Sequence, residues 1–420
     1  MSDYRLTTLS NGLRIASVEM PHMQSVSVGI WIGVGARFES AALGGMSHFI
    51  EHLMFKGTRK RNAKQITESV EGIGGYLNAF TTEDHTCYYA KAGARHLPVL
   101  ADVLADMMLN SQFEPEEIER ERDVIREEIM MYRDQPAQYV QEMLSETMWP
   151  RHPLGRALTG TVDSIAAFKR SDFLQFVDRN YNGRSMGVSV AGRASHESVV
   201  ALFRPLLEKV NPGSPPRFTR ARSLSGAKVS FLAQDTEQTH LAIGFYSFGR
   251  TDERRFALKL LSVILGENMS SRLFQKLREQ YGLCYSVQTE MTALADSGLI
   301  SIEAGLDPSK LQKVLKTTLS ELDKICLKKP GKDEVRRAKD YTVGQTLMGL
   351  ESTSNQMNWM GESMMGYRKI LDPVEIEEKL MAVTPEAIQE VARLCLDRSH
   401  LGISVIGPIK DKKQIEEWIR

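Results

Sequence analysis

The sequence predicts an α+β protein made of two homologous α/β-layered domains. Each domain is expected to be an antiparallel-rich sheet packed with helices, and the two domains are expected to face each other across a cavity. Segments rich in Val and Ile, which favour strands, alternate with long helical segments. This alternation is typical of α+β layers and not of a simple parallel βαβ sheet. The same order of segments recurs in the second half, which indicates a duplicated domain.

The first half begins with strand-like segments and ends in helices. A glycine pair precedes a region that reads as two short strands, or as a strand and a turn. The later helical stretch is interrupted near Pro136, because proline breaks the helical hydrogen-bond pattern. In chain order we expect strands over 13–20 and 25–39, a helix around His48, strands within 74–93, and a long helical stretch from Glu114 towards Trp149.

A linker separates the two halves. Its sequence, PGSPPRFTRARSLSGAK, contains three prolines and suits an extended, exposed connector. We therefore expect a first domain over 1–211, the linker over 212–228 and a second domain over 229–420. Segment 239–250 resembles 24–37, segment 298–306 echoes 85–93, and segment 332–349 echoes 115–132; an offset of about 217 residues aligns the last pair, and the earlier pairs need a small slip.

The composition excludes several classes of protein. Lys and Arg together number 53, as do Asp and Glu, so a nucleic-acid binder with its usual basic excess is not expected. No run approaches the roughly 18 apolar residues of a membrane span. The first residues lack the long apolar core of a secretory signal, which favours a bacterial cytoplasm, although a mature mitochondrial matrix protein would look similar. The four scattered cysteines fit reduced thiols: Cys87, Cys284, Cys326 and Cys395.

The segment MSHFIEHLMFK (46–56) places two imidazoles and a carboxylate in an otherwise apolar helix. His48 and His52 are four residues apart, so both lie on one helix face, one turn apart. Neutral imidazole is a preferred zinc ligand, and Glu51 lies close to the same face without having to bind the metal. This is the H-x-x-E-H arrangement. Because such a motif can arise by chance, a third ligand is needed.

The helical stretch 118–132 supplies candidates for that ligand. At 100° per residue, Glu121 and Glu128 fall on one stripe with three isoleucines, two turns apart. Buried carboxylates are costly unless they are paired or bind a metal. Glu128 as a ligand and Glu121 as a supporting acid would explain both. The alternative is that the stripe is only partly buried and that the acids meet nearby arginines; the histidine pair favours the metal.

These motifs resemble the inverzincin metallopeptidases, the family of pitrilysin and insulin-degrading enzyme. The resemblance rests on HFIEH (48–52) and ERDVIREE (121–128), together with LSNGLRI, GGYLNAFTTEDHTCYY and HPLGRALTGT, and it spans nearly the whole chain. The length and the duplication are most similar to the branch that contains mitochondrial processing peptidase and its bacterial relatives. The resemblance implies a zinc-dependent endopeptidase that hydrolyses peptides or unfolded segments in a chamber between its domains.

The resemblance also implies roles for individual residues. His48, His52 and Glu128 would be the Zn²⁺ ligands, which leaves a fourth position for water. Glu51 would be the general base, and Glu121 the acid that supports a ligand. Asn78 and Ala79 match residues of an edge strand that pairs with the peptide substrate; without the resemblance, this segment would be read as an ordinary strand. Arg278 and Tyr285 match a pair that holds the substrate from the second domain; alone they would be read as a solvated helix residue and a half-buried strand residue.

The second half lacks the histidines and glutamates of the predicted metal site. At the offset of about 217, His48, Glu51 and His52 face Leu265, Asn268 and Met269, and Glu121 and Glu128 face Ala338 and Gln345. We expect a homodimer, or a heterodimer with a related chain. The alternative function is that of a non-catalytic scaffold or partner subunit of a processing-peptidase-like complex. The chain departs from the family pattern at none of the named site positions, which favours the enzyme.

Overall fold

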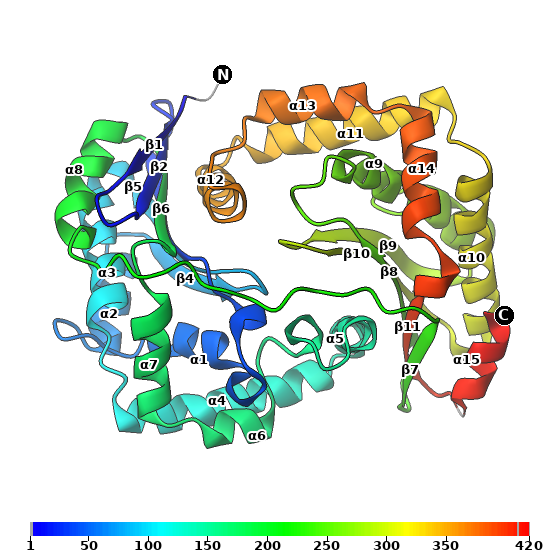
Figure 1. The fold of residues 1–420 in the computed structure, drawn as a ribbon, viewed down its shortest axis with the longest axis horizontal. Coiled ribbons are helices and arrows are strands. Elements are labelled where there is room, and N and C mark those ends of the chain that lie inside the picture. The colour runs from blue at the N-terminus through cyan, green and yellow to red at the C-terminus, as the bar shows by residue number, and fades with distance from the viewer. Residues whose placement is uncertain (1–2, 410, 420) are drawn as a thin grey trace. The chain divides into compact units, whose positions relative to one another are not determined.

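The computed structural model describes residues 3–409 and 411–419 and packs them into two compact units (Figure 1). Each unit has its own sheet and its own apolar core. The prediction of two layered α+β domains is confirmed. The first unit contains Met1–Ile129, Ala157–Thr219 and Leu347–Asp372, and the second contains Met130–Arg156, Arg220–Thr346 and Pro373–Arg420.

The first sheet has six strands. In spatial order they are β1 (Tyr4–Thr8), β2 (Arg14–Glu19), β6 (Met186–Gly192), β3 (Ser25–Ile32), β5 (Thr86–Gly93) and β4 (Tyr76–Thr81). Only the β2–β6 pair is parallel, and the other four pairs are antiparallel. A parallel pair needs a crossover connection, and here the chain passes through many helices between β2 and β6. In the part of the chain that the structure describes, β4 pairs with β5 alone and so forms an edge.

The second sheet repeats this topology with five strands. In spatial order they are β7 (Lys228–Ala233), β11 (Gly402–Gly407), β8 (Thr239–Ser247), β10 (Gly298–Leu306) and β9 (Cys284–Ala293). The β7–β11 pair is parallel and the others are antiparallel, as for β2, β6, β3, β5 and β4 of the first sheet. The predicted correspondences of β8 with β3 and of β10 with β5 therefore hold in space.

Helices cover both faces of the first sheet. They are α1 (Met46–Leu53), α2 (Ala63–Glu71), α3 (Leu97–Asn110), α4 (Pro115–Arg133), α6 (Val162–Ala167), α7 (Arg170–Asn180), α8 (His196–Leu207) and α12 (Thr353–Tyr367). The main core lies between one sheet face and α1, α3, α7 and α8. Helix α12 packs on the other face, against β2, β3 and β6.

The second unit has a similar set of helices. They are α5 (Pro136–Met148), α9 (Arg255–Leu265), the π-helical segment η5 (Phe274–Gln280), α10 (Leu311–Leu327), α11 (Lys332–Gly349), α13 (Pro373–Ala382), α14 (Pro385–Cys395) and α15 (Lys412–Trp418). The long helical stretch of the first half breaks between α4 and α5 at Pro136, as expected. Within the described residues, no helix combines the length and the apolar character needed to cross a membrane.

Each half of the chain contributes one helix to the sheet of the other half. Helix α5 packs on β8 and β11 of the second sheet, where it buries Val140, Leu144 and Met148. Helix α12 packs on the first sheet and buries three methionines. The predicted boundaries at 211 and 229 describe the repeat along the sequence and stay a prediction, whereas the packing units are discontinuous in sequence.

Glycines and methionines fit together where α12 meets the first sheet. A Cβ at Gly29 would lie 2.4 Å from Sδ of Met357, and a Cβ at Gly187 would lie 2.5 Å from Cε of Met364. Conversely, a Cβ at Gly361 of α12 would lie 1.9 Å from the Trp31 ring. Flexible methionines fill the irregular gaps that such close approach leaves. The dense Met content of this segment is therefore explained by packing.

The repeat offset varies along the chain, which corrects one predicted pairing. Helix α11 begins 217 residues after α4, at Lys332 against Pro115, but β10 begins only 212 residues after β5. Helix α9 ends at Leu265, so the predicted pairing of His48 with Leu265 is wrong. Helix α9 begins 209 residues after α1, which places the counterparts of His48–His52 at 257–261, a segment without His, Cys, Asp or Glu. The second half still lacks the metal-binding side chains.

Candidate metal centre

Helix α1 is fixed to the core of the first unit by its apolar residues. Phe49 and Ile50 are fully buried, and Phe49 packs edge-on against Phe173 with ring centroids 4.9 Å apart. Such burial restricts rotation of the helix about its axis. The two imidazoles of His48 and His52 lie together beside this core, with ring centroids 4.7 Å apart.

Helix α4 presents the predicted mixed stripe. Ile118, Ile125 and Ile129 are buried, and Glu121 is only 4% exposed. The alternative that the two acids of the stripe meet arginines is not supported, because the arginines of α4 pair with other acids. These pairs are Arg120 with Glu117, Arg122 with Glu119, and Arg126 with Asp123.

Three side chains converge at one point between α1 and α4. One ligand atom from each of His48, His52 and Glu128 lies within 4.8 Å of the others. Oε2 of Glu128 is 3.6 Å from Nε2 of His48 and 3.5 Å from Nε2 of His52. Ligand atoms about 2.0–2.1 Å from a tetrahedral zinc ion lie about 3.4 Å from one another. The two distances from Glu128 to the imidazole nitrogens are therefore close to those of a tetrahedral metal site.

The bonding state of these atoms also fits a metal. Within the described residues, Oε2 of Glu128 is buried and accepts no hydrogen bond. A buried carboxylate oxygen without a donor is costly, and a cation removes that cost. The set of two imidazoles and one carboxylate is a donor set that Zn²⁺ prefers at catalytic sites. The residues present thus fit a zinc ion.

A chain of contacts orients the second imidazole. Nδ1 of His52 lies 3.1 Å from Oε2 of Glu121, and Oε1 of Glu121 lies 2.6 Å from Nζ of Lys56. When His52 loses its second proton to bind a metal, Nδ1–H can donate to Glu121, which leaves the lone pair of Nε2 for the predicted metal position. Partners of this kind fix the tautomer and raise the basicity of a metal-binding histidine. The predicted supporting role of Glu121 agrees with this geometry.

The titration behaviour of the metal-free cluster follows from burial and neighbouring charge. Burial and the adjacent His52 lower the pKa of His48 to about 4. Burial opposes charge on His52 too, but the neighbouring carboxylates of Glu121 and Glu128 prevail and raise its pKa to about 9. Burial would raise the pKa of Glu121, yet the contacts with His52 and Lys56 lower it. At neutral pH and without a metal, His52 therefore carries a proton on both ring nitrogens and lies between the two carboxylates.

Glu51 lies on the same helix as the imidazoles and contacts the edge strand. Its Oε2 accepts a hydrogen bond from Oγ1 of Thr81, the last residue of β4, at 2.5 Å. Burial raises the pKa of Glu51, although the Thr81 hydrogen bond and the charge of His52 oppose this. A carboxylate with a raised pKa can accept and return a proton near neutral pH.

The predicted substrate residues lie on the edge strand β4. Asn78 is exposed and Ala79 is half-buried, in the alternating pattern of an edge strand with one covered face. The Asn78 side-chain oxygen accepts a hydrogen bond from the Ala79 amide at 2.8 Å. The same strand carries Thr81, so the contact with Glu51 ties this edge to α1.

The two remaining predicted residues belong to the second unit. Arg278 lies in η5, with its guanidinium carbon 4.9 Å from the centre of the Phe274 ring. Tyr285 lies at the start of β9 with 63% of its surface exposed. The helical segment ends at Gln280 before Gly282, whose φ is +55°, as the glycine signal predicts. Their role towards a substrate stays a prediction.

Sequence reasoning missed two residues of the centre. Lys56 lies four residues after His52 but beyond the end of α1 at Leu53, so helical spacing does not indicate that it reaches Glu121. Thr81 contacts Glu51 across 30 positions of sequence, and no local signal indicates this contact.

Comparison with known proteins agrees with the geometry. Residues 14–162 match the family described as insulinase (Peptidase family M16), and residues 167–341 match the peptidase M16 inactive domain. An uncharacterized zinc protease of Streptomyces coelicolor is 39% identical over 97% of this chain and 90% of its own length. The uncharacterized zinc protease YmxG of Bacillus subtilis is 36% identical over 96% of this chain and 97% of its own.

Solved structures share the fold. A protease from Helicobacter pylori superimposes with a TM-score of 0.91 at 22% identity, covering 97% of this chain and all of that one. A structure from Pseudomonas fluorescens described as a peptidase M16 inactive domain gives a TM-score of 0.88 at 17% identity, with 97% and 98% covered. The two sequence relatives carry the resemblance along almost the entire chain, and we conclude that it belongs to peptidase family M16, the insulinase family.

Proposed function

We propose that the chain is a zinc-dependent endopeptidase that hydrolyses peptides or unfolded segments in a chamber between its two related domains. The observation that carries this proposal is the convergence of His48, His52 and Glu128 within 4.8 Å, with Glu51 on the same helix as both imidazoles. The names of the bacterial relatives, uncharacterized zinc proteases, support it.

Zinc has a defined part in this proposal. His48, His52 and Glu128 would hold the ion, and the bound ion would lower the pKa of water to about 7 and polarise the carbonyl of the scissile bond. The contact between Glu121 and His52 keeps the coordinating nitrogen of the ring directed at this position.

Glu51 would move the proton. Its carboxylate accepts a proton from the attacking water and then gives it to the leaving amine. The Thr81 hydroxyl holds one carboxylate oxygen in place, so that the other stays available for the proton. Loss of the carboxylate should therefore abolish turnover while leaving all three proposed zinc ligands intact.

The substrate would bind as an added strand. The free edge of β4 offers backbone donors and acceptors beside Asn78 and Ala79, which suits an extended peptide. Arg278 and Tyr285 of the second unit would hold the substrate once it is bound. We propose that the working form is a homodimer or a heterodimer with a related chain, in the cytoplasm of a bacterium.

A quenched fluorescent peptide tests the function. We expect cleavage by the zinc-loaded chain, no cleavage after a chelator, and recovery when zinc is restored. Glu51→Gln should lower kcat about 100- to 10,000-fold with zinc content unchanged. The matched control is Glu71→Gln, which changes an exposed acid of α2.

Other results would point elsewhere. If Glu51→Gln cleaves like the wild type, then Glu51 is not the base. If the zinc-loaded wild type cleaves no peptide, alone or with a related chain, the non-catalytic scaffold is the better description.

A further inference from the structure

No side chain of its own N-cap residue caps the N-terminus of helix α1. Its N-cap is Gly45, which has no side chain and whose φ of +92° lies in the left-handed region. The carboxylate of Glu39 takes the capping role from outside the helix. Its Oε2 accepts from the Gly45 amide at 2.8 Å, and its Oε1 accepts from the Ser47 amide at 2.6 Å. An acid at this end also interacts favourably with the helix dipole.

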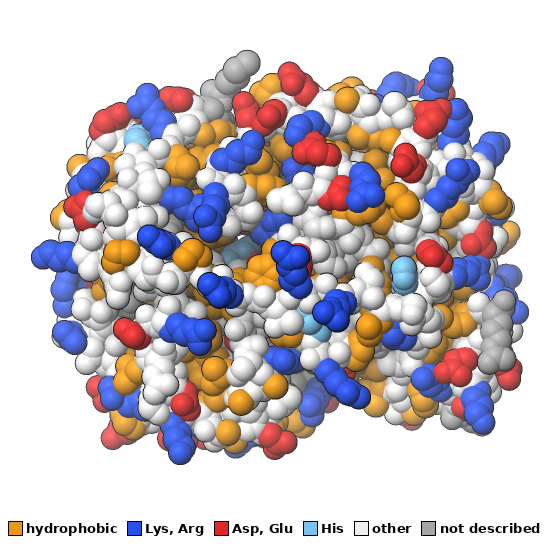
Figure 2. All heavy atoms as spheres, viewed as in Figure 1, with side chains coloured by type: hydrophobic (Ala, Val, Ile, Leu, Met, Phe, Trp, Pro, Cys, Tyr) orange, Lys and Arg blue, Asp and Glu red, His pale blue; other side chains and the backbone are white. Residues whose placement is uncertain are grey.

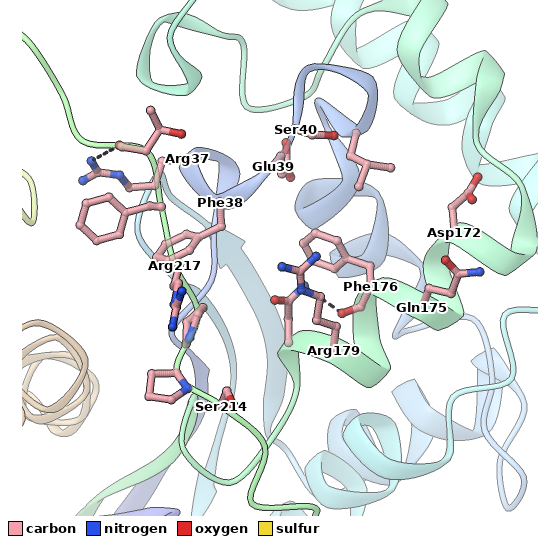
Figure 3. A pocket seen from close by; sticks show the side chains of 16 residues that line it. Arg37, Phe38, Glu39, Ser40, Asp172, Gln175, Phe176, Arg179, Ser214 and Arg217 are labelled. Carbon is pink, nitrogen blue, oxygen red and sulfur yellow. Dashed lines mark hydrogen bonds between the residues drawn. The ribbon is translucent and has the colours of Figure 1, made fainter.

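The burial of Glu39 shows that these bonds hold it firmly. Glu39 is only 5% exposed, although it borders a pocket of about 860 Å³ that the linker also lines (Figure 3). A carboxylate is costly to bury unless it is hydrogen-bonded. The two amide donors of α1 offset this cost, so the positions of Glu39 and of the helix start depend on each other.

The segment that carries Glu39 is also fixed to the turn after the edge strand. The amides of Ala36 and Arg37 donate to the carbonyl oxygens of Thr82 and Glu83, at 3.1 and 3.0 Å. The fully buried Arg37 side chain donates to Asp84 at 3.1 Å. One short segment therefore connects the β4–β5 turn to the start of α1.

We propose that Glu39 is a positioning residue of the metal centre. Its carboxylate sets the start of α1 relative to the β4–β5 turn, and so directs His48, which lies in the first turn of the helix. The inference rests on the proposed zinc peptidase and adds a residue that touches neither metal nor substrate. Since Ser47 directly precedes His48 and Gly45 lies three residues before it, a shift of the helix start displaces that ligand first.

Two substitutions of Glu39 and one control test the proposal. Glu39→Ala removes both acceptors, Glu39→Gln keeps one oxygen acceptor, and Glu71→Gln is the matched control. For each purified chain we would measure zinc affinity by chelator competition, kcat and KM for a peptide, and the visible absorption spectrum with Co²⁺ in place of zinc.

We expect Glu39→Ala to bind zinc roughly 10- to 100-fold more weakly, as is usual for loss of a residue that orients a ligand. The Co²⁺ spectrum should change, and kcat should fall while KM stays within about twofold, because the β4 edge is untouched. Glu39→Gln should lose less, and the control should match the wild type.

The outcomes separate the two proposals. If the wild type itself binds no zinc, the proposed function fails. If the wild type binds zinc but both Glu39 variants keep its affinity, spectrum and kcat and lose only thermal stability, then Glu39 is merely structural and this inference is overturned. If Glu39→Ala does not fold, Glu39→Gln decides by the same criteria.

Discussion

Two regions of the molecule share a scaffold and differ in their polar side chains. In the first unit, α1 and α4 bring together two imidazoles and two buried or half-buried carboxylates. In the second unit, the end of α9 and the start of α11 border a pocket of about 290 Å³. Ala338 lines that pocket at the place in α11 that corresponds to Glu121 in α4. The described residues there include no group that could hold a metal.

The difference separates what the fold needs from what the chemistry needs. The five strands of the second sheet have the same order as the corresponding five strands of the first. Each unit has a large apolar core, to which the histidines and acids of the metal centre do not contribute. The second unit therefore shows that His48, Glu121 and Glu128 are not required to form this architecture. Keeping buried acids in the first unit costs stability unless they are paired or bind a metal. On the face that Figure 2 shows, acidic and basic side chains are interspersed over the surface.

The largest expected effect comes from removing the carboxylate ligand. We expect Glu128→Gln to weaken zinc binding more than 100-fold, beyond the loss usual for a residue that only orients a ligand. Chelator competition measures this loss. The corresponding residue of α11, Gln345, is exposed, and Gln345→Ala should leave zinc affinity unchanged. If Glu128→Gln and Gln345→Ala weakened zinc binding equally, the proposed restriction of the metal site to the first unit would be contradicted.

The next effect concerns the second unit's proposed contribution to turnover. Tyr285→Phe removes an exposed hydroxyl, and we expect kcat to fall about 100-fold, the size seen when one donor to a reacting carbonyl is lost. Zinc content should not change, because Tyr285 is not among the residues that could hold the metal. Steady-state kinetics with metal analysis checks both. Loss of zinc in this variant would show that the assigned role is wrong.

Removing a charged side chain that supports His52 should weaken zinc binding less. Glu121→Gln and Lys56→Met each break the chain of contacts to His52, and each should weaken zinc binding roughly 10-fold. The second unit offers a control, because Arg272 and Glu334 form a bidentate salt bridge beside its pocket. Nε and Nη2 of Arg272 lie 2.7 and 2.8 Å from the two carboxylate oxygens of Glu334. Arg272→Met should lower thermal stability and leave zinc affinity as in the wild type. If Arg272→Met weakened zinc binding as much as Glu121→Gln and Lys56→Met, the proposed role of Glu121 and Lys56 in supporting His52 would be contradicted.

Replacing His85 should have the smallest effect on zinc binding and turnover, but it should measurably change how the stability depends on pH. It is 7% exposed and packs against Trp31, and within the described residues neither ring nitrogen has a hydrogen-bond partner. Burial lowers its pKa to about 4. Because the unfolded chain binds this proton more readily, the stabilisation is complete above about pH 6.5 and is lost as the pH falls towards 4.

Urea unfolding of the chelator-treated chain at pH 7 and pH 5 measures this contribution. His85 should account for a loss of up to about 2 kcal/mol between these pH values, so His85→Phe should lose less stability than the wild type by about this amount. The matching turn of the second unit, residues 294–297, has no imidazole. If the variant and the wild type lose the same stability, His85 is not the group that titrates.

The periodic parts of the fold could be predicted from the sequence. Strand β3 is rich in Val and Ile, β8 is mostly apolar and aromatic, and α4 shows a clear helical stripe that is followed by the break at Pro136. The metal cluster could be predicted because His48 and His52 are local, and because Glu121 and Glu128 break an apolar stripe. These signals need only a few turns of helix to be recognised.

The parts that depend on distant contacts could not be predicted. The repeat does not indicate that α5 and α12 pack on the sheet of the other half, because an apolar helix face fits either sheet. The register between α1 and α9 was wrong because the connecting segments differ in length. The contacts of Thr81 with Glu51 and of Glu39 with the start of α1 likewise arise only when the chain is folded.

The zinc content of the purified chain tests the central claim most directly. Metal analysis of the wild type and of the double variant His48→Ala, His52→Ala should give one zinc ion per chain and none, respectively. This result would place a single metal centre in the first unit. No zinc in the wild type, two ions per chain, or full retention in the double variant would contradict the account.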